Sequence, residues 1–186
     1  MSCKIDRFRI YCVYLWVKVG ESGAPGQAGA LQLKDRLELM FFLGQYNHNL
    51  DEKGRLTIPA RFRDTLVDEG AYIMQGFDTN LIVLTEATFD MISQRLNQAS
   101  LTDATARLLR RLLFSTASRA EFDKAGRILI PQYLRVTAGI DSEAVVVGAG
   151  KYIEIWSTER WSGQLALLQD PEANASRFEP YSILFG

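Results

Sequence analysis

Apolar residues after residue 40 occur in short runs and alternations, which predict a series of short strands. Most of these runs end at a turn-forming Gly, Asp or Pro. The predicted strands cover residues 45–50, 55–58, 71–75, 81–84, 118–122, 127–130, 144–147 and 152–156. The same order of strands and turns therefore occurs twice along the chain.

Helices are predicted between and after these strands, which together favour an α+β fold. Residues 59–67 and 131–137 each begin at a proline, which suits the first turn of a helix. Thr85, Thr102 and Ser157 can each cap a longer helix, because a hydroxyl accepts a backbone N–H bond. Apolar residues at helical spacing follow these caps: Phe89, Ile92 and Leu96; Leu108, Leu109, Leu112 and Leu113; Trp161, Leu165 and Leu168.

One segment of the chain occurs twice. Residues 51–59 read Asp-Glu-Lys-Gly-Arg-Leu-Thr-Ile-Pro, and residues 123–131 read Asp-Lys-Ala-Gly-Arg-Ile-Leu-Ile-Pro. The offset is 123 − 51 = 72, and we expect it to continue without a gap for more than forty residues. Pairs that match at this offset include Arg63/Arg135, Ile73/Val145, Gly76/Gly148 and Val83/Ile155. The chain after residue 40 is therefore predicted to hold two copies of one unit.

The repeated segment contains a turn with its own chemistry. An aspartate can accept backbone N–H bonds there, and a glycine three residues later adopts a positive φ at little cost. The arginine that follows can donate a bidentate pair to guanine or to phosphate. It can also pair with its own aspartate and hold the turn, and the two roles are compatible. The candidate contact residues are Arg55 and Arg127, and the residues supporting the turns are Asp51, Gly54, Asp123 and Gly126.

Composition narrows the range of functions. The 186 residues suffice for one compact domain or two small ones, and 47% hydrophobic with 23% charged residues is typical of a globular chain. The net charge is −1, so any nucleic-acid binding must come from local patches. The longest apolar run is far shorter than the roughly 20 residues of a membrane span, so no membrane partner is expected.

The sequence gives little support for a catalytic or metal-binding function. Two cysteines and one histidine are too few for a structural zinc site. His48 lies on a predicted strand and is interpreted as a surface or packing residue. The sequence contains no recognisable nucleophile–base pair or phosphate-binding glycine loop. We expect no catalytic residue, metal, cofactor or small-molecule substrate, and therefore no enzyme.

Residues 1–39 differ from the rest of the chain. They contain Cys3 and Cys12, a short apolar stretch and a Gly- and Ala-rich run over residues 20–30. A signal peptide is one interpretation, although Lys18 interrupts the apolar stretch. The favoured interpretation is a flexible extension or a wrongly assigned start, with Met40 as the natural first residue.

The two Asp-x-x-x-Arg turns and the motif of residues 44–63 resemble the MraZ family of bacterial DNA-binding regulators, which contain two AbrB-like (SpoVT-AbrB) modules. The resemblance extends from Met40 to about Gln169. It implies a tandem swapped-hairpin β-barrel pseudodimer with flanking amphipathic helices. It also implies ring-like homo-oligomers, located in the cytoplasm at the nucleoid. These would bind double-stranded DNA at repeated operators upstream of a cell-division and cell-wall gene cluster.

The resemblance suggests which residues bind DNA. The first copy is richer in positive charge because it contains Arg55, Lys53 and Arg61. We therefore expect the first copy to be the main reader of DNA. In the second copy we expect Arg127 and Lys124 to contribute. Arg63 and Arg135 are interpreted as solvated or structurally paired. The arginines of the linker region, Arg107, Arg110, Arg111 and Arg119, are interpreted as a solvated helix face or a subunit contact.

These expectations divide the chain into five parts. Module 1 spans residues 44–91 and module 2 spans residues 118–163, with a linker helix region at 92–117. The extension at 1–39 and a tail at 164–186 flank them. The alternative function is an AbrB-like antitoxin or another protein-interaction module, but such proteins usually carry one module and a disordered tail.

Overall fold

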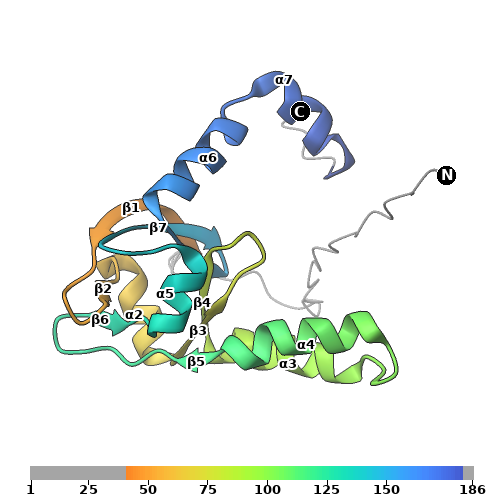
Figure 1. Ribbon diagram of the computed structural model, residues 1–186, viewed down its shortest axis with the longest axis horizontal. Helices are drawn as coiled ribbons and strands as arrows, with labels where there is room; N and C mark the ends of the chain where they lie inside the picture. Colours follow the sequence, from red (N-terminus) through yellow and green to blue (C-terminus); the bar gives the residue numbers. More distant parts are fainter. Residues whose placement is uncertain (1–40, 182–186) are drawn as a thin grey trace, which may run out of the picture.

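The computed structural model describes residues 41–181, and the extension predicted for residues 1–39 lies outside this range. The fold contains both helices and antiparallel strands, so the α+β expectation is confirmed (Figure 1). The strands are β1 (Phe42–Asn49), β2 (Arg55–Thr57), β3 (Ala71–Gln75), β4 (Leu81–Thr85), β5 (Ser118–Arg119), β6 (Arg127–Leu129), β7 (Glu143–Gly150) and β8 (Tyr152–Trp156). The helices are α2 (Ala60–Asp68), α3 (Glu86–Gln98), α4 (Ala104–Thr116), α5 (Gln132–Ala138), α6 (Thr158–Leu168), α7 (Pro171–Phe178) and the short 3-10 helix η1 (Glu179–Tyr181).

The strands of the two copies are interleaved in one sheet. We call β1 to α3 the first repeat and β5 to α6 the second repeat. Six strands form one antiparallel sheet in the order β1-β7-β8-β4-β3-β5, and β2 pairs with β6 in a separate ribbon. Only the β3–β4 and β7–β8 hairpins pair within one repeat, whereas β1–β7, β4–β8, β3–β5 and β2–β6 join the two repeats.

The register of the β2–β6 ribbon is symmetric. Leu56 pairs with Ile128, which is its equivalent at the offset of 128 − 56 = 72. On either side, Arg55 pairs with Leu129 and Thr57 pairs with Arg127. The expected closed barrel is not observed, because within residues 41–181 the six-stranded sheet is open, with β1 and β5 at its edges.

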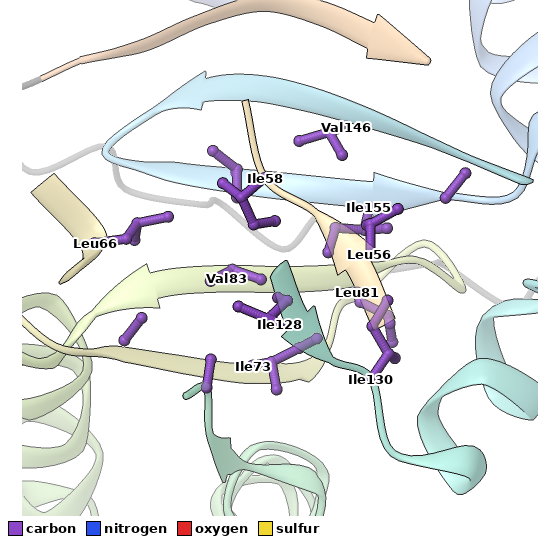
Figure 2. Packing of buried hydrophobic residues seen from close by; sticks show 14 of the residues in the cluster. Leu56, Ile58, Leu66, Ile73, Leu81, Val83, Ile128, Ile130, Val146 and Ile155 are labelled. Atoms are coloured by element: carbon purple, nitrogen blue, oxygen red, sulfur yellow. The ribbon is translucent and has the colours of Figure 1, made fainter. Parts of the chain in front are cut away.

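The main core lies where the ribbon meets the sheet (Figure 2). Ile58 and Ile130 extend from the ribbon strands and pack with Val83 and Ile155 from the central strands of the sheet. All four side chains have 0% of their surface exposed. Each repeat thus supplies half of a shared core, as expected for units too small to bury a core alone.

One part of the predicted repeat alignment is wrong. The inward-facing residues are Ala71 and Ile73 in β3, and Ala144 and Val146 in β7. The offset between these strands is therefore 144 − 71 = 73 rather than 72. The offset returns to 72 in β4 and β8, where Val83 and Ile155 are equivalent. The pairs that sequence matching assigned here, Ile73/Val145 and Gly76/Gly148, are not structurally equivalent.

The slip follows from the amino acids of β7. Residues 145–147 are all valine, so a shift of one residue still places an apolar side chain on each face of the strand. Counted between equivalent residues, the second repeat has one more residue before β7 (Pro131 to Ala144, against Pro59 to Ala71). It has one fewer residue in its hairpin (Val146 to Ile155, against Ile73 to Val83). The two changes cancel, which hides both of them from a comparison of sequences.

The helix caps largely follow the predictions. Thr85 and Ser157 accept backbone N–H bonds at the starts of α3 and α6, which confirms both caps. Helix α4 is capped by Asp103 rather than by Thr102, because the Asp103 carboxylate accepts from two backbone N–H groups. The strand expected at 118–122 is shorter than predicted, since β5 ends at Arg119 and only Phe122 forms an isolated bridge to Ile128. None of the helices within residues 41–181 has the length and apolar character needed to cross a membrane.

Candidate nucleic-acid interface

The first turn, residues 51–55, is held by the side chain of Asp51. Its Oδ1 accepts backbone N–H bonds from Lys53 at 3.0 Å and from Arg55 at 2.9 Å. Gly54 has a φ of 76° and donates its backbone N–H to the Asp51 carbonyl at 2.8 Å. The aspartate and the glycine are thus both needed for this turn, as its sequence suggested.

The second turn, residues 123–127, has the same construction. Asp123 Oδ1 accepts from the backbone N–H groups of Ala125 at 2.9 Å and Arg127 at 3.0 Å. Gly126 has a φ of 73° and donates to the Asp123 carbonyl at 2.9 Å. The two turns lie side by side, at the left of Figure 1, where the chain enters β2 and β6.

Four side chains connect the two turns in a closed set of ion pairs, which we call the charge ring. Arg55 Nε lies 2.7 Å from Asp51 Oδ2, and Arg127 Nη2 lies 2.7 Å from Asp123 Oδ2. Each arginine also reaches the other turn, because Arg55 Nη1 is 3.4 Å from Asp123 and Arg127 Nη1 is 3.3 Å from Asp51. Pairing with the own aspartate, one of the two roles considered above, is therefore present in both repeats.

The charge ring changes the acidity of its members. A side-chain hydrogen bond from Arg127, together with backbone N–H bonds, lowers the pKa of Asp123 from 3.8 to about 2. The backbone N–H of Arg55, followed by its side chain, likewise lowers the pKa of Asp51. The hydrogen bond to Asp123 raises the pKa of Arg127. Both carboxylates are therefore charged at neutral pH, and the two guanidinium groups balance their charge.

The arginines of the charge ring remain accessible. About 31% of the Arg55 side chain and 30% of the Arg127 side chain are exposed. A guanidinium has five N–H donors, and Nη2 of Arg55 has no hydrogen-bond partner within residues 41–181. The carboxylates thus orient the arginines while leaving donors available to a ligand.

The other predicted contact residues are exposed, and two of them belong to the turns. Lys53 and Lys124 are exposed within the two turns. Arg61 is exposed on α2 and donates from Nη1 to the Tyr46 hydroxyl at 3.2 Å, so it lies outside the charge ring. The equivalent position in α5 is Tyr133, whose hydroxyl donates to the Thr116 carbonyl at 2.9 Å.

The chain matches the family model of the MraZ protein, which is described as antitoxin-like, over residues 41–112 and again over residues 113–178. The chain belongs to the MraZ family. It is 46% identical to a transcriptional regulator MraZ of Herpetosiphon aurantiacus over 69% of this chain and 90% of that protein. The same name is given to relatives from Thermomicrobium roseum (42% identical, 68% and 89%) and Roseiflexus castenholzii (42% identical, 74% and 93%).

Two arginines of this MraZ-family chain have contacts that the sequence did not indicate. Arg135 of α5 packs on Gly54, since a Cβ at Gly54 would lie 2.8 Å from Arg135 Nε and Cζ. Arg63 of α2 packs on Gly126 in the same way, and its Nη2 donates to the Ile58 carbonyl at 3.1 Å. The signal available in the sequence was the identity of this position in the two copies.

The single histidine of this MraZ-family chain lies on a strand. His48 lies on β1 opposite Ala144 and is half-buried, and desolvation lowers its pKa. Among residues 41–181, no three histidine, cysteine or acidic side chains are grouped so that they could hold a metal ion. These observations agree with its interpretation as a strand residue.

Proposed function

We propose that this protein is a sequence-specific transcriptional regulator that binds double-stranded DNA through its two turns. The site would act on repeated operator sequences upstream of a cell-division and cell-wall gene cluster. The protein would work in the cytoplasm, associated with the nucleoid, and as a ring-like homo-oligomer. The names of the MraZ relatives support the regulatory role, and the paired turns support the means of binding.

The observation that carries the proposal is the position of Arg55 and Arg127. The charge ring holds both guanidinium groups at one end of the molecule, oriented by carboxylates and one-third exposed. An arginine held in this way can donate two parallel N–H bonds to guanine O6 and N7 with little loss of side-chain entropy. Base acceptors or phosphates would replace the cross-turn contacts at 3.3–3.4 Å before the shorter contacts at 2.7 Å.

Phosphate contacts would come from the exposed cations around the charge ring. Lys53 and Lys124 are exposed within the turns, and Arg61 is exposed on α2. Because the second repeat has Tyr133 at the position of Arg61, we propose that the first repeat is the main reader of DNA. Phosphate contacts fix the position of a protein on the duplex, whereas base contacts provide its specificity.

We also propose that modules 44–91 and 118–163 form a barrel-like, swapped-hairpin pseudodimer. The strand pairs between repeats support this, as does the pair of main-chain bonds from Ile58 to Gly126 and from Ile130 to Gly54. Such an arrangement places both turns at the same end.

Oligomerisation would compensate for the weak electrostatic attraction between one chain and DNA. From Met40 onward the chain has 15 Lys and Arg against 18 Asp and Glu, a net charge of −3. One pair of turns would therefore bind weakly. Several pairs on a ring would bind repeated sites with a high effective concentration.

The proposal is tested by selecting duplexes from a random pool with the purified full chain, while the mass of the oligomer is measured in parallel. Arg55→Ala is expected to weaken binding to the enriched duplex by about 1–3 kcal/mol per lost base contact. Arg127→Ala is expected to have a smaller effect. Arg111→Ala serves as the control, because Arg111 is exposed on α4, away from the turns (Figure 1).

A selection that enriches no sequence would contradict the proposal and leave the interaction module as the better explanation. Equal binding by wild type and by Arg55→Ala, with unchanged oligomer mass and thermal stability, would exclude the assigned contact. Enrichment of a single unrepeated site by a monomer would contradict the ring.

A further inference from the structure

The contacts of Arg63 and Arg135 are crossed between the repeats. Arg135 belongs to the second repeat but packs on Gly54 of the first turn. Arg63 belongs to the first repeat but packs on Gly126 of the second turn. In each case the atoms nearest to the glycine belong to the guanidinium group rather than to the aliphatic stem.

The burial of these groups indicates packing rather than solvation. The Nε atoms of Arg63 and Arg135 are buried, and neither has a hydrogen-bond partner within residues 41–181. A solvated arginine would keep this donor in water. The planar group therefore lies against the turn, where the glycine leaves room for it and where any Cβ would collide.

We propose that Arg135 and Arg63 are positioning residues, each of which holds the DNA-reading turn of the opposite repeat. The inference rests on the function proposed above, because it assigns to these residues the placement of Arg55 and Arg127. Each guanidinium covers the glycine just before the contact arginine and limits the movement of the turn. The two positive charges also lie beside the neutral charge ring and raise the local potential for a polyanion.

The packing explains why both positions are arginine. A lysine would keep the positive charge, but its ammonium group is compact and strongly hydrated and cannot lie flat on a peptide turn. Arg63→Lys and Arg135→Lys thus separate the shape of the group from its charge. Arg61→Lys is the matched control, because Arg61 lies on α2 near Arg63 but contacts Tyr46 instead of a turn.

Amide hydrogen exchange in the full chain, measured residue by residue by NMR, tests the crossed contact without DNA. Arg135→Lys should speed exchange several-fold at the hydrogen-bonded amides of Gly54 and Arg55, and leave those of Gly126 and Arg127 unchanged. Arg63→Lys should have the opposite pattern. Arg61→Lys should change neither turn.

Binding to the duplex most enriched in the selection then tests the functional part. Each Arg→Lys variant should lose several-fold in affinity, with no change in charge and little change in thermal midpoint. A merely structural role would lower the midpoint and speed exchange throughout the core. Arg111→Lys, which changes an exposed arginine of α4 outside the proposed interface, should bind like the wild type.

Faster exchange in the turn of the same repeat, or in both turns equally, would overturn the crossed assignment. Crossed exchange effects with unchanged affinity for a duplex that Arg55→Ala fails to bind would overturn the positioning role alone. If no duplex is enriched at all, the proposed function fails. The exchange pattern would then still decide whether the crossed contact exists.

Discussion

The two repeats are alike where they pair with each other and different where they face helices. Ile58 and Ile130, and Leu56 and Ile128, occupy matching positions in the shared core, and the two turns have the same hydrogen bonds. The outer faces of the hairpins have diverged. Residues that must fit an equivalent partner across the repeat are constrained, whereas residues that meet different helices are not.

The coverage of the outer faces is the largest difference. Helices α3 and α4 cover the β3–β4 hairpin and form a cluster around Met74, Leu84, Leu96 and Leu113. Within residues 41–181, α6 is the one helix that covers the corresponding face of the second repeat, where Trp156 and Trp161 pack with ring centroids 5.9 Å apart. Helix α6 extends away from the sheet and α7 lies beyond it, with no buried residue (Figure 1).

The first strands of the two repeats also differ. Strand β1 runs over eight residues, whereas β5 has only two because the chain enters it directly from α4. The contact between this first strand and the helix after the proline, α2 or α5, also uses different side chains in the two repeats. Arg61 meets the Tyr46 hydroxyl in the first repeat, whereas Tyr133 meets the Ser118 hydroxyl at 2.8 Å in the second. The first repeat thus has a cation at the position where the second has a tyrosine.

Separating the repeats is expected to have the largest effect. Residues 40–100 and 101–186, expressed as two chains, should each be largely unfolded, because all four strand pairs between the repeats join a strand of one fragment to a strand of the other. Mixing the fragments should restore structure. Circular dichroism and exchange protection measure this, and two independently folded monomeric fragments would contradict the shared core.

Truncation in the core should affect the two repeats equally. Ile58→Ala and Ile130→Ala are each expected to lower the free energy of unfolding by about 4 kcal/mol, toward the upper end of such losses, because both side chains are fully buried. Denaturant unfolding of the full chain measures the loss. A difference of more than roughly 1 kcal/mol between the variants would mean that the two positions are equivalent in the fold but not in their contribution to stability.

Truncation on the outer faces should affect the repeats unequally. Trp161→Ala is expected to cost about 3 kcal/mol, because Trp161 is buried against Trp156 and also donates to Gln45 Oε1 at 3.2 Å. Phe89→Ala, at the equivalent position, should cost roughly half as much, since Phe89 is only half-buried and α4 adds other contacts. Equal losses of unfolding free energy, measured with denaturant, would show that α4 adds little to the stability of the face it covers.

The smallest expected effect concerns the acid dependence of the turns. With its folded-state pKa at about 2 instead of 3.8, the Asp123 carboxylate contributes stability that is complete above about pH 4 and lost as the pH falls toward 2. Asp51 has the same sign. Asp51→Asn and Asp123→Asn should each lower the thermal midpoint at pH 7, and the difference from wild type should shrink as the pH approaches 2. An ordinary titration midpoint for either carboxyl, measured by NMR, would contradict the charge ring.

Sequence patterns predicted the positions of the strands and helices better than they predicted which residues of the two repeats are equivalent. Nearly every strand and helix of the repeats lies where apolar spacing, turn residues and caps placed it, because these signals act over a few neighbouring residues. The slip in β7 escaped notice because Val145, Val146 and Val147 satisfy both faces of the strand. The prediction of Thr102 as a cap failed because Asp103, the next residue, is an equally good acceptor in a better position.

The candidate site likewise combines contacts that the local sequence predicts with contacts that it does not. That Asp51 and Asp123 hold their turns and pair with the arginine four residues later follows from local chemistry. That Arg55 also meets Asp123, and that Arg135 covers Gly54, involves residues 68 and 81 positions apart (123 − 55 and 135 − 54). No local pattern contains that information.

The amino-acid sequence alone thus established a twofold repeat, its turns and the family that the repeat resembles, because short-range spacing encodes all three. The tertiary structure decided which strands pair across the repeats and which charges meet at the turns. Alternation specifies which face of a strand is buried but not which strand lies beside it. The partners are chosen by burial of the shared core, which draws both repeats into one sheet and brings Arg55 and Arg127 together.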